Sequence, residues 1–206
     1  MDVVKTGTTT IGLVYKEGVV LAADRRATAG HIVANKNAEK VMAISDRIGI
    51  TTAGMVADLQ AMVRLMRSEL TLYEIRSGSK LDTDGAVGLL SAILFNKRLS
   101  MNLIYGEFII GGYDKEAKLF SIDEAGGQGK DKFTVTGSGG VFALGVLEGD
   151  YKEDMSEEEA VKLAYKAVSS SIRRDVYTGE GIDISVINKK GYKKLSDEEI
   201  QKVVNR

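Results

Sequence analysis

Short blocks of alternating apolar and polar residues run through the first 54 positions of the chain and indicate β-strands. The predicted strands cover residues 11–15, 19–23, 40–44 and 48–53. Lys16-Glu17-Gly18 joins the first two as a tight hairpin, and Gly54 ends the fourth. Residues 27–31 are small and polar, so a loop is expected there. Four consecutive strands with short connections predict an antiparallel meander.

From residue 56 onward the spacing of apolar residues changes to the helical period. Apolar residues fall three, four and seven positions apart over residues 56–76, and Gly78 follows as a helix-ending glycine. Ser156 and Ser196 each precede a glutamate by three positions, a capping-box pattern that predicts a helix start. Helices are therefore expected over residues 56–76, 83–99, 140–147 and 156–174 and after Ser196. Further strands are expected over residues 103–111, 117–122, 132–136, 182–188 and 192–195.

The chain thus alternates blocks of strands with pairs of helices, and no linker or shift in composition divides it. Its 206 residues are enough for one domain with a large hydrophobic core. Strand blocks separated by helix pairs predict an α+β fold, in which helices cover stacked antiparallel sheets.

Composition narrows the classes of function. The 28 basic and 29 acidic residues give a net charge of −1 without a long basic run, so no nucleic-acid partner is expected. No apolar stretch is long enough to span a membrane, and residues 1–7 lack the apolar core of a signal peptide. The absence of cysteine excludes disulfides, thiolate metal sites and a cysteine nucleophile, which fits a cytoplasmic location. The single histidine, His31, leaves no multi-histidine metal site and is expected to be exposed in a loop.

The first candidate for chemistry is Thr8, which follows Gly7 and opens a run of three threonines. An internal threonine is a poor nucleophile because no base takes its hydroxyl proton. A threonine at the first position of a chain has its own α-amine within reach, with a pKa of roughly 8. Threonine activated in this way is a known nucleophile arrangement. The triplet alone leaves two alternatives open: cleavage between Gly7 and Thr8, or a threonine-rich edge strand without chemistry.

Asp24 and Lys40 are candidate partners of Thr8. Asp24 ends the second predicted strand and Lys40 begins the third, so in a meander the strand ends converge near Thr8. The charge of Lys40 would depress the pKa of a Thr8 amine and favour its basic form, and Asp24 would hold Lys40 in place. The alternative for each residue is a solvated charge at a strand end.

Two glycine-containing turns could supply backbone donors. Gly54 lies where a strand passes into a helix, and Gly137-Ser138-Gly139-Gly140 precedes another helix. Such turns can direct backbone N–H groups at a developing oxyanion, or can be simple turns. The second turn lacks the Lys-Ser/Thr ending of a phosphate-binding loop. Asp175 and Thr178, at the end of the 156–174 helix, could orient a site or belong to an ordinary helix terminus.

These residues occur within a longer series of short motifs. The series includes Gly7-Thr8-Thr9-Thr10-Ile11-Gly12, Ala22-Ala23-Asp24-Arg25-Arg26-Ala27-Thr28, Thr52-Ala53-Gly54, Gly111-Gly112-Tyr113-Asp114, Thr136-Gly137-Ser138-Gly139 and Arg174-Asp175 with Thr178-Gly179. In order and spacing, over nearly the whole chain, the series closely resembles a proteasome β subunit of the archaeal type. The resemblance implies an N-terminal-nucleophile hydrolase fold, a four-layer αββα sandwich of two antiparallel sheets flanked by helices.

The resemblance also implies a role for each matching residue. Residues 1–7 would be a propeptide removed by self-cleavage after Gly7, leaving one catalytic domain over residues 8–206. Thr8 matches the nucleophile, Lys40 the lysine that tunes its amine, and Asp24 the carboxylate partner of that lysine. Gly54 matches the oxyanion-hole glycine. The supporting residues are Ser138, Asp175 and Thr178; the family more often has serine at the last position, which keeps the hydroxyl.

By the same match, a substrate pocket would be lined by mostly small and apolar residues. They are Ala27, Ala38, Met42, Thr52 and Val56. Cleavage after apolar or aromatic residues is therefore expected, although the Thr52 hydroxyl makes the pocket less uniformly apolar.

The implied function is that of a threonine endopeptidase subunit of the 20S proteasome core, which hydrolyses unfolded proteins inside an enclosed chamber without a metal or cofactor. The implied partners are proteasome α subunits, further copies of the chain in a heptameric β ring, and a regulatory ATPase acting through the α ring. The alternatives are a structural β-ring subunit that never matures, a bacterial two-ring relative and a metabolic amidase. Retention of the residues that match the family's catalytic set favours the active subunit. Self-processing is expected to depend on assembly of the rings.

Overall fold

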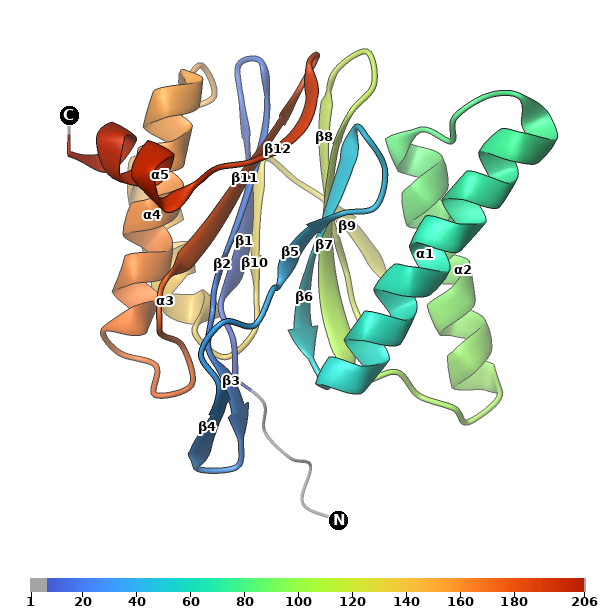
Figure 1. The fold of residues 1–206 in the computed structure, drawn as a ribbon, viewed down its shortest axis with the longest axis horizontal. Coiled ribbons are helices and arrows are strands. Elements are labelled where there is room, and N and C mark those ends of the chain that lie inside the picture. The colour runs from blue at the N-terminus through green and yellow to red at the C-terminus, as the bar shows by residue number, and fades with distance from the viewer. Residues whose placement is uncertain (1–6, 206) are drawn as a thin grey trace.

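The computed structural model describes residues 7–205, so residues 1–6 of the predicted propeptide lie outside the described part of the chain. Within that part, two five-stranded antiparallel sheets pack face to face and five helices cover their outer faces (Figure 1). The predicted four-layer sandwich is confirmed.

The first sheet carries the N-terminal strand in its interior, next to an edge strand. In order across the sheet, its strands are β10 (Phe133–Thr136), β1 (Thr10–Tyr15), β2 (Gly18–Asp24), β11 (Ile182–Asn188) and β12 (Gly191–Lys194). The helices on its outer face are α3 (Gly140–Asp150), α4 (Glu157–Ile172) and α5 (Asp197–Val204).

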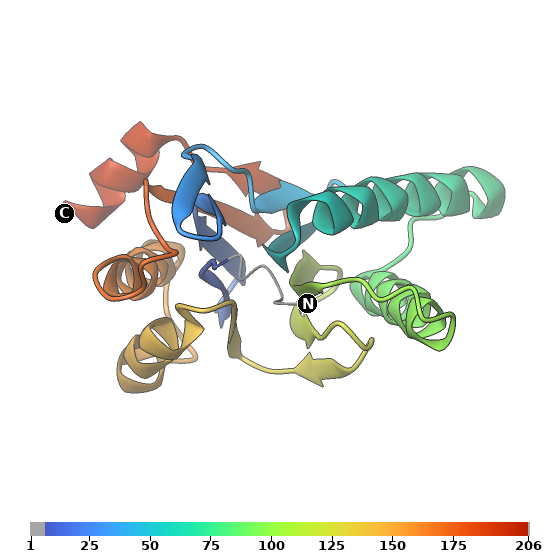
Figure 2. The same ribbon diagram turned by 90° about the horizontal axis from the view of Figure 1, so that it is seen from below.

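The second sheet has the strand order β5 (Val41–Ala43), β6 (Ile48–Gly54), β7 (Gly106–Tyr113), β8 (Ala117–Ile122) and β9 (Gln128–Lys130). Its outer face is covered by α1 (Val56–Ser77) and α2 (Thr83–Leu99). Seen from below, these two helices lie on one side of the paired sheets and α3, α4 and α5 on the other (Figure 2).

The predicted four-stranded meander is wrong. After β2 the chain leaves the first sheet, forms the hairpin of β3 (Ala27–Ala29) and β4 (Ile32–Asn35), and enters the second sheet at β5. Alternation of apolar and polar residues shows which side chains face a core but not which strand is the neighbour, so the pattern did not reveal the change of sheet. A loop was predicted over residues 27–31, but Ala27–Ala29 form strand β3, so this prediction was also wrong there. His31, at the hairpin turn, is exposed as predicted.

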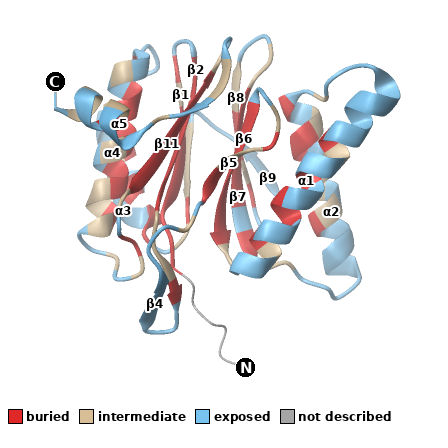
Figure 3. Ribbon diagram, in the orientation of Figure 1, coloured by how far each residue is buried: buried red, intermediate tan, exposed pale blue. Residues whose placement is uncertain are grey.

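Apolar side chains fill three layers. Along β2, Val20 and Ala22 pack toward α3 and α4, whereas Val19 and Leu21 pack against the second sheet. Figure 3 shows the resulting pattern, with buried strands between helices whose outer faces are exposed. The two sheets approach each other closely at Gly12, because glycine has no side chain. A Cβ at this position would lie 2.6 Å from a methyl carbon of Leu119.

The predicted helix ends are largely confirmed. Ser156 and Ser196 each form a complete capping box at the start of α4 and α5. Gly78 ends α1 in the left-handed conformation, with a φ of 70°. The strand expected from residue 103 begins instead at Gly106, and β9 was missed because its three residues are polar and exposed. No helix within residues 7–205 combines the length and the apolar character needed to cross a membrane.

Candidate active site

Thr8 lies just before β1 and is buried, with 5% of its surface exposed. The turn after β10 holds its backbone from two directions. The Thr8 N–H donates to Ser138 Oγ at 3.2 Å, and the Gly139 N–H donates to the Thr8 carbonyl oxygen at 3.2 Å. Gly137, in the same turn, has a φ of +84°, and a Cβ there would lie 2.2 Å from the Thr8 carbonyl oxygen. Only glycine therefore allows the turn to approach Thr8 this closely.

Gly7 is buried against the side chains of Tyr177 and Ser138. A Cβ at this position would lie 1.9 Å from Tyr177 Cβ and 2.7 Å from Ser138 Oγ. The peptide bond between Gly7 and Thr8 is therefore packed where a larger residue at position 7 would displace its surroundings. In this covalent state the Thr8 nitrogen is an amide and has no basic lone pair.

Asp24, the last residue of β2, is fully buried and surrounded by four donors. Its Oδ1 accepts from Lys40 Nζ at 2.7 Å and from the Thr9 N–H at 3.0 Å. Its Oδ2 accepts from the backbone N–H groups of Gly179 at 2.9 Å and Arg26 at 3.1 Å. A buried carboxylate is costly unless its oxygens are satisfied in this way. The arrangement fixes Asp24 beside the residue that follows Thr8.

Lys40 reaches Asp24 from the opposite sheet. It precedes β5 and pairs with β6 through a hydrogen bond from the Thr52 N–H to its carbonyl oxygen at 3.0 Å. The ammonium group is almost entirely buried, and this burial lowers the pKa of Lys40, while the neighbouring Asp24 charge partly opposes the shift. The predicted contact between Lys40 and Asp24 is present, although it spans the two sheets rather than one meander.

A second polar group supports Thr8 from the end of α4. Asp175 Oδ2 accepts hydrogen bonds from Ser138 Oγ and from Thr178 Oγ1, both at 2.6 Å. Since the Ser138 hydroxyl proton is directed at Asp175, a lone pair of Ser138 Oγ faces the Thr8 N–H. Thr178 Oγ1 lies 2.8 Å from Thr9 Oγ1, a contact that could not be predicted from the sequence pattern. The three predicted supporting residues are thus brought together.

A cavity of about 720 Å³ opens beside Thr8. Thr8, Lys40 and Gly54 line it together with all five residues of the predicted pocket, Ala27, Ala38, Met42, Thr52 and Val56. Gly54 ends β6 with a φ of +139°, and a Cβ there would lie 2.3 Å from the Tyr105 carbonyl oxygen, so glycine is required.

One face of α1 forms a wall of this cavity that the sequence interpretation missed. Beyond Val56, the residues on this face are Leu59, Gln60, Val63, Arg64 and Arg67. Their spacing of three and four positions would have identified them as one helical face, but the periodicity was assigned to the core alone. The cavity therefore has apolar and polar lining residues, and α1 contributes two arginines to it.

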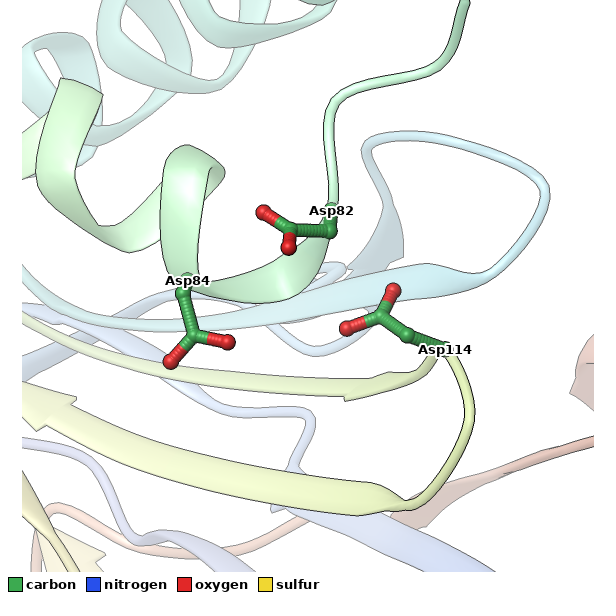
Figure 4. A group of neighbouring side chains, drawn as sticks. All are labelled: Asp82, Asp84 and Asp114. Carbon is green, nitrogen blue, oxygen red and sulfur yellow. The ribbon is translucent and has the colours of Figure 1, made fainter.

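Three further carboxylates gather at the opposite end of β7 from Gly54 (Figure 4). The oxygens of Asp82, Asp84 and Asp114 lie within 4.8 Å of one another. Asp82 caps α2 by accepting from the Gly85 N–H, Asp114 accepts from the Thr83 N–H, and Lys118 forms ion pairs with Asp84 and Asp114. Helix capping and Lys118 account for this cluster without a metal.

Comparison with known proteins shows the family to which the chain belongs. A family model described as "Proteasome subunit" matches residues 4–187. The chain belongs to the proteasome subunit family. Members of this proteasome family from archaea match it over nearly its full length, which confirms the predicted resemblance to β subunits.

Three of these proteasome relatives illustrate the similarity. "Proteasome subunit beta" of Methanocaldococcus fervens is 49% identical over 208 residues, covering all of this chain and 92% of the relative. "Proteasome subunit beta" of Methanospirillum hungatei is 48% identical over 196 residues, covering 94% of this chain and 93% of the relative. "Proteasome subunit beta 1" of Thermococcus onnurineus is 46% identical over 195 residues and covers 95% of each chain.

Proposed function

We propose that this chain is a threonine endopeptidase subunit of the 20S proteasome core, with Thr8 as the nucleophile after cleavage of the Gly7–Thr8 bond. One observation carries the proposal. Thr8 is buried at the edge of a 720 Å³ cavity, and its nitrogen hydrogen-bonds to Ser138 Oγ, which is itself bonded to Asp175. A threonine that served only as an edge-strand residue would need neither the cavity nor this polar support.

Self-cleavage is the first proposed reaction. Thr8 Oγ attacks the carbonyl carbon of Gly7, the C–N bond breaks, and the Thr8 nitrogen takes the hydroxyl proton to become an amine. Water then hydrolyses the resulting ester, so that Gly7 leaves as a carboxylate and the hydroxyl of Thr8 is restored. Ser138 Oγ, already 3.2 Å from the Thr8 nitrogen, would keep the new amine in position.

Peptide hydrolysis is the second proposed reaction. The Thr8 amine accepts the proton from Oγ as Oγ attacks the substrate carbonyl, and the Gly54 N–H stabilises the oxyanion. The protonated amine then gives its proton to the leaving nitrogen, and water hydrolyses the acyl-enzyme. The nearby positive charge of Lys40 favours the neutral form of the Thr8 amine, and Asp24 holds Lys40 in place at 2.7 Å.

The proposed partners follow from the relatives, which are named as proteasome β subunits. They are α subunits, further copies of the chain in a heptameric ring, a regulatory ATPase ring and unfolded polypeptides in the cytoplasm. The competing proposal is a structural ring subunit that keeps its N-terminal segment. The complete set of contacts around Thr8 favours the active subunit, because a structural subunit has no need to maintain them.

The mass of the chain tests the proposal directly. On co-assembly with an archaeal proteasome α subunit, we expect the chain to lose the mass of residues 1–7, while the chain kept alone retains its full mass. Intact-mass spectrometry of both samples measures the difference. A chain of unchanged mass in a completed double-ring particle would support the structural subunit and contradict the proposed protease.

The lining of the cavity predicts the cleavage preference. Ala27, Ala38 and Met42 contribute small and apolar surface to the cavity, so cleavage after apolar or aromatic residues is expected to exceed cleavage after charged ones about tenfold. Peptide-library profiling of the assembled particle measures this ratio. Cleavage mainly after acidic or basic residues would contradict the assignment of the pocket, with Arg64 and Arg67 then the first residues to replace.

A further inference from the structure

Glu107 forms a hydrogen bond between the two sheets next to Thr8. It is the second residue of β7 in the second sheet, and its side chain is exposed. Its Oε2 accepts from the Gly137 N–H at 2.9 Å, and Gly137 directly follows β10 of the first sheet. Glu107 forms no ion pair within residues 7–205, and the neutral Gly137 N–H is the hydrogen-bond donor to its carboxylate there.

The Gly137 end of this bond belongs to the turn that holds Thr8. Ser138 accepts from the Thr8 N–H, and the Gly139 N–H donates to the Thr8 carbonyl oxygen. The turn has little freedom to move independently of Thr8, because Gly137 is packed directly on that carbonyl. A shift of the turn therefore shifts the nucleophile.

The Glu107 end belongs to the strand pair that places Gly54. In the pairing of β6 with β7, Glu107 lies opposite Ala53, and the adjacent pair is Gly54 with Gly106. The backbone of Glu107 is thus one residue from the partner of the proposed oxyanion donor. The Lys40–Asp24 ion pair joins the sheets through β5 and β2, whereas Glu107 joins them through β7 and the turn after β10.

We infer that Glu107 is a positioning residue that sets the spacing between the Thr8 nucleophile and the Gly54 N–H. The inference rests on the proposed function, in which both groups act on the same carbonyl. The length of the Glu107 side chain brings Oε2 within 2.9 Å of the Gly137 nitrogen, and a neutral amide oxygen at the same reach could accept the same hydrogen bond. The cavity is lined by other elements, so loss of Glu107 affects the transition state more than substrate binding.

Three variants of the full chain, each assembled with an archaeal proteasome α subunit, test the inference. Glu107→Asp keeps the charge but is one methylene too short to reach Gly137, whereas Glu107→Gln keeps the length and an acceptor oxygen but loses the charge. Glu116→Ala, at the exposed turn between β7 and β8, removes a glutamate whose side chain has no such contact with residues 7–205. The readouts are kcat and KM for a fluorogenic peptide with an apolar residue before the cleaved bond, and the rate of maturation by intact mass.

Glu107→Asp is expected to lose about fivefold to tenfold in kcat and to mature more slowly, with KM within about twofold of the unaltered chain. Glu107→Gln is expected to retain at least about half of kcat, and Glu116→Ala all of it. Unchanged kcat in Glu107→Asp would overturn the inference, as would an equal loss in Glu107→Gln, which would assign the effect to charge. An unaltered chain that neither matures nor hydrolyses peptide would instead reject the proposed function and this inference with it.

Discussion

Replacement of Thr8 with alanine is expected to leave the assembled chain at its full mass and to lower peptide hydrolysis at least about a thousandfold. Alanine removes the hydroxyl that both proposed reactions use. The fold should persist, because the contacts that hold residue 8 involve its backbone N–H and carbonyl groups. Intact mass and kcat/KM of the particle give the two measurements.

Thr8→Ser is the matched control, since it keeps the hydroxyl at nearly the same place. It is expected to mature and to hydrolyse peptide at a rate much closer to that of threonine. A Thr8→Ala particle that still loses residues 1–7 would show that another group cuts the chain. A particle that retains activity would exclude Thr8 as the nucleophile.

Replacement of Asp24 with alanine is expected to destabilise the isolated chain by about 3–5 kcal/mol. The variant leaves the buried ammonium of Lys40 unpaired and removes the acceptor of the Thr9 and Gly179 N–H groups. Urea unfolding gives the difference in the free energy of unfolding. Asp46→Ala is the control: it removes one partner of the exposed Lys80–Asp46 pair and should cost at most about 1 kcal/mol.

The pH dependence of this variant carries a further expectation. Burial already lowers the pKa of Lys40 below 10.5, and loss of Asp24 removes the charge that opposes the shift. Between the folded pKa of Lys40 and 10.5, the unfolded chain binds more protons, so the stability of Asp24→Ala rises with pH across that window. A stability of Asp24→Ala that stays constant or falls as the pH rises toward 10.5 would contradict a lowered pKa of Lys40 in the folded variant.

Much of this arrangement could be predicted from the sequence, for physical reasons that differ between features. Helical spacing located α1 and α2, and the Ser-x-x-Glu patterns located α4 and α5, because these signals are local. Sheet membership is not local, so the contact between Asp24 and Lys40 was predicted while its route across two sheets was not. Glu107 was missed because one exposed glutamate in a strand produces no pattern, and its partner is a backbone group 30 residues away.

The division of the site between two sheets has a consequence for the timing of proteolysis. Thr8, Asp24 and Ser138 belong to the half built on the first sheet, whereas Lys40 and Gly54 belong to the half built on the second. A half-formed molecule therefore holds only part of the proposed machinery. If the proposed function holds, a nascent chain in which one half is still incomplete cannot hydrolyse peptide bonds. Under the proposed function, completion of the fold is therefore required before the subunit can cleave a peptide bond, in addition to the expected assembly of the rings.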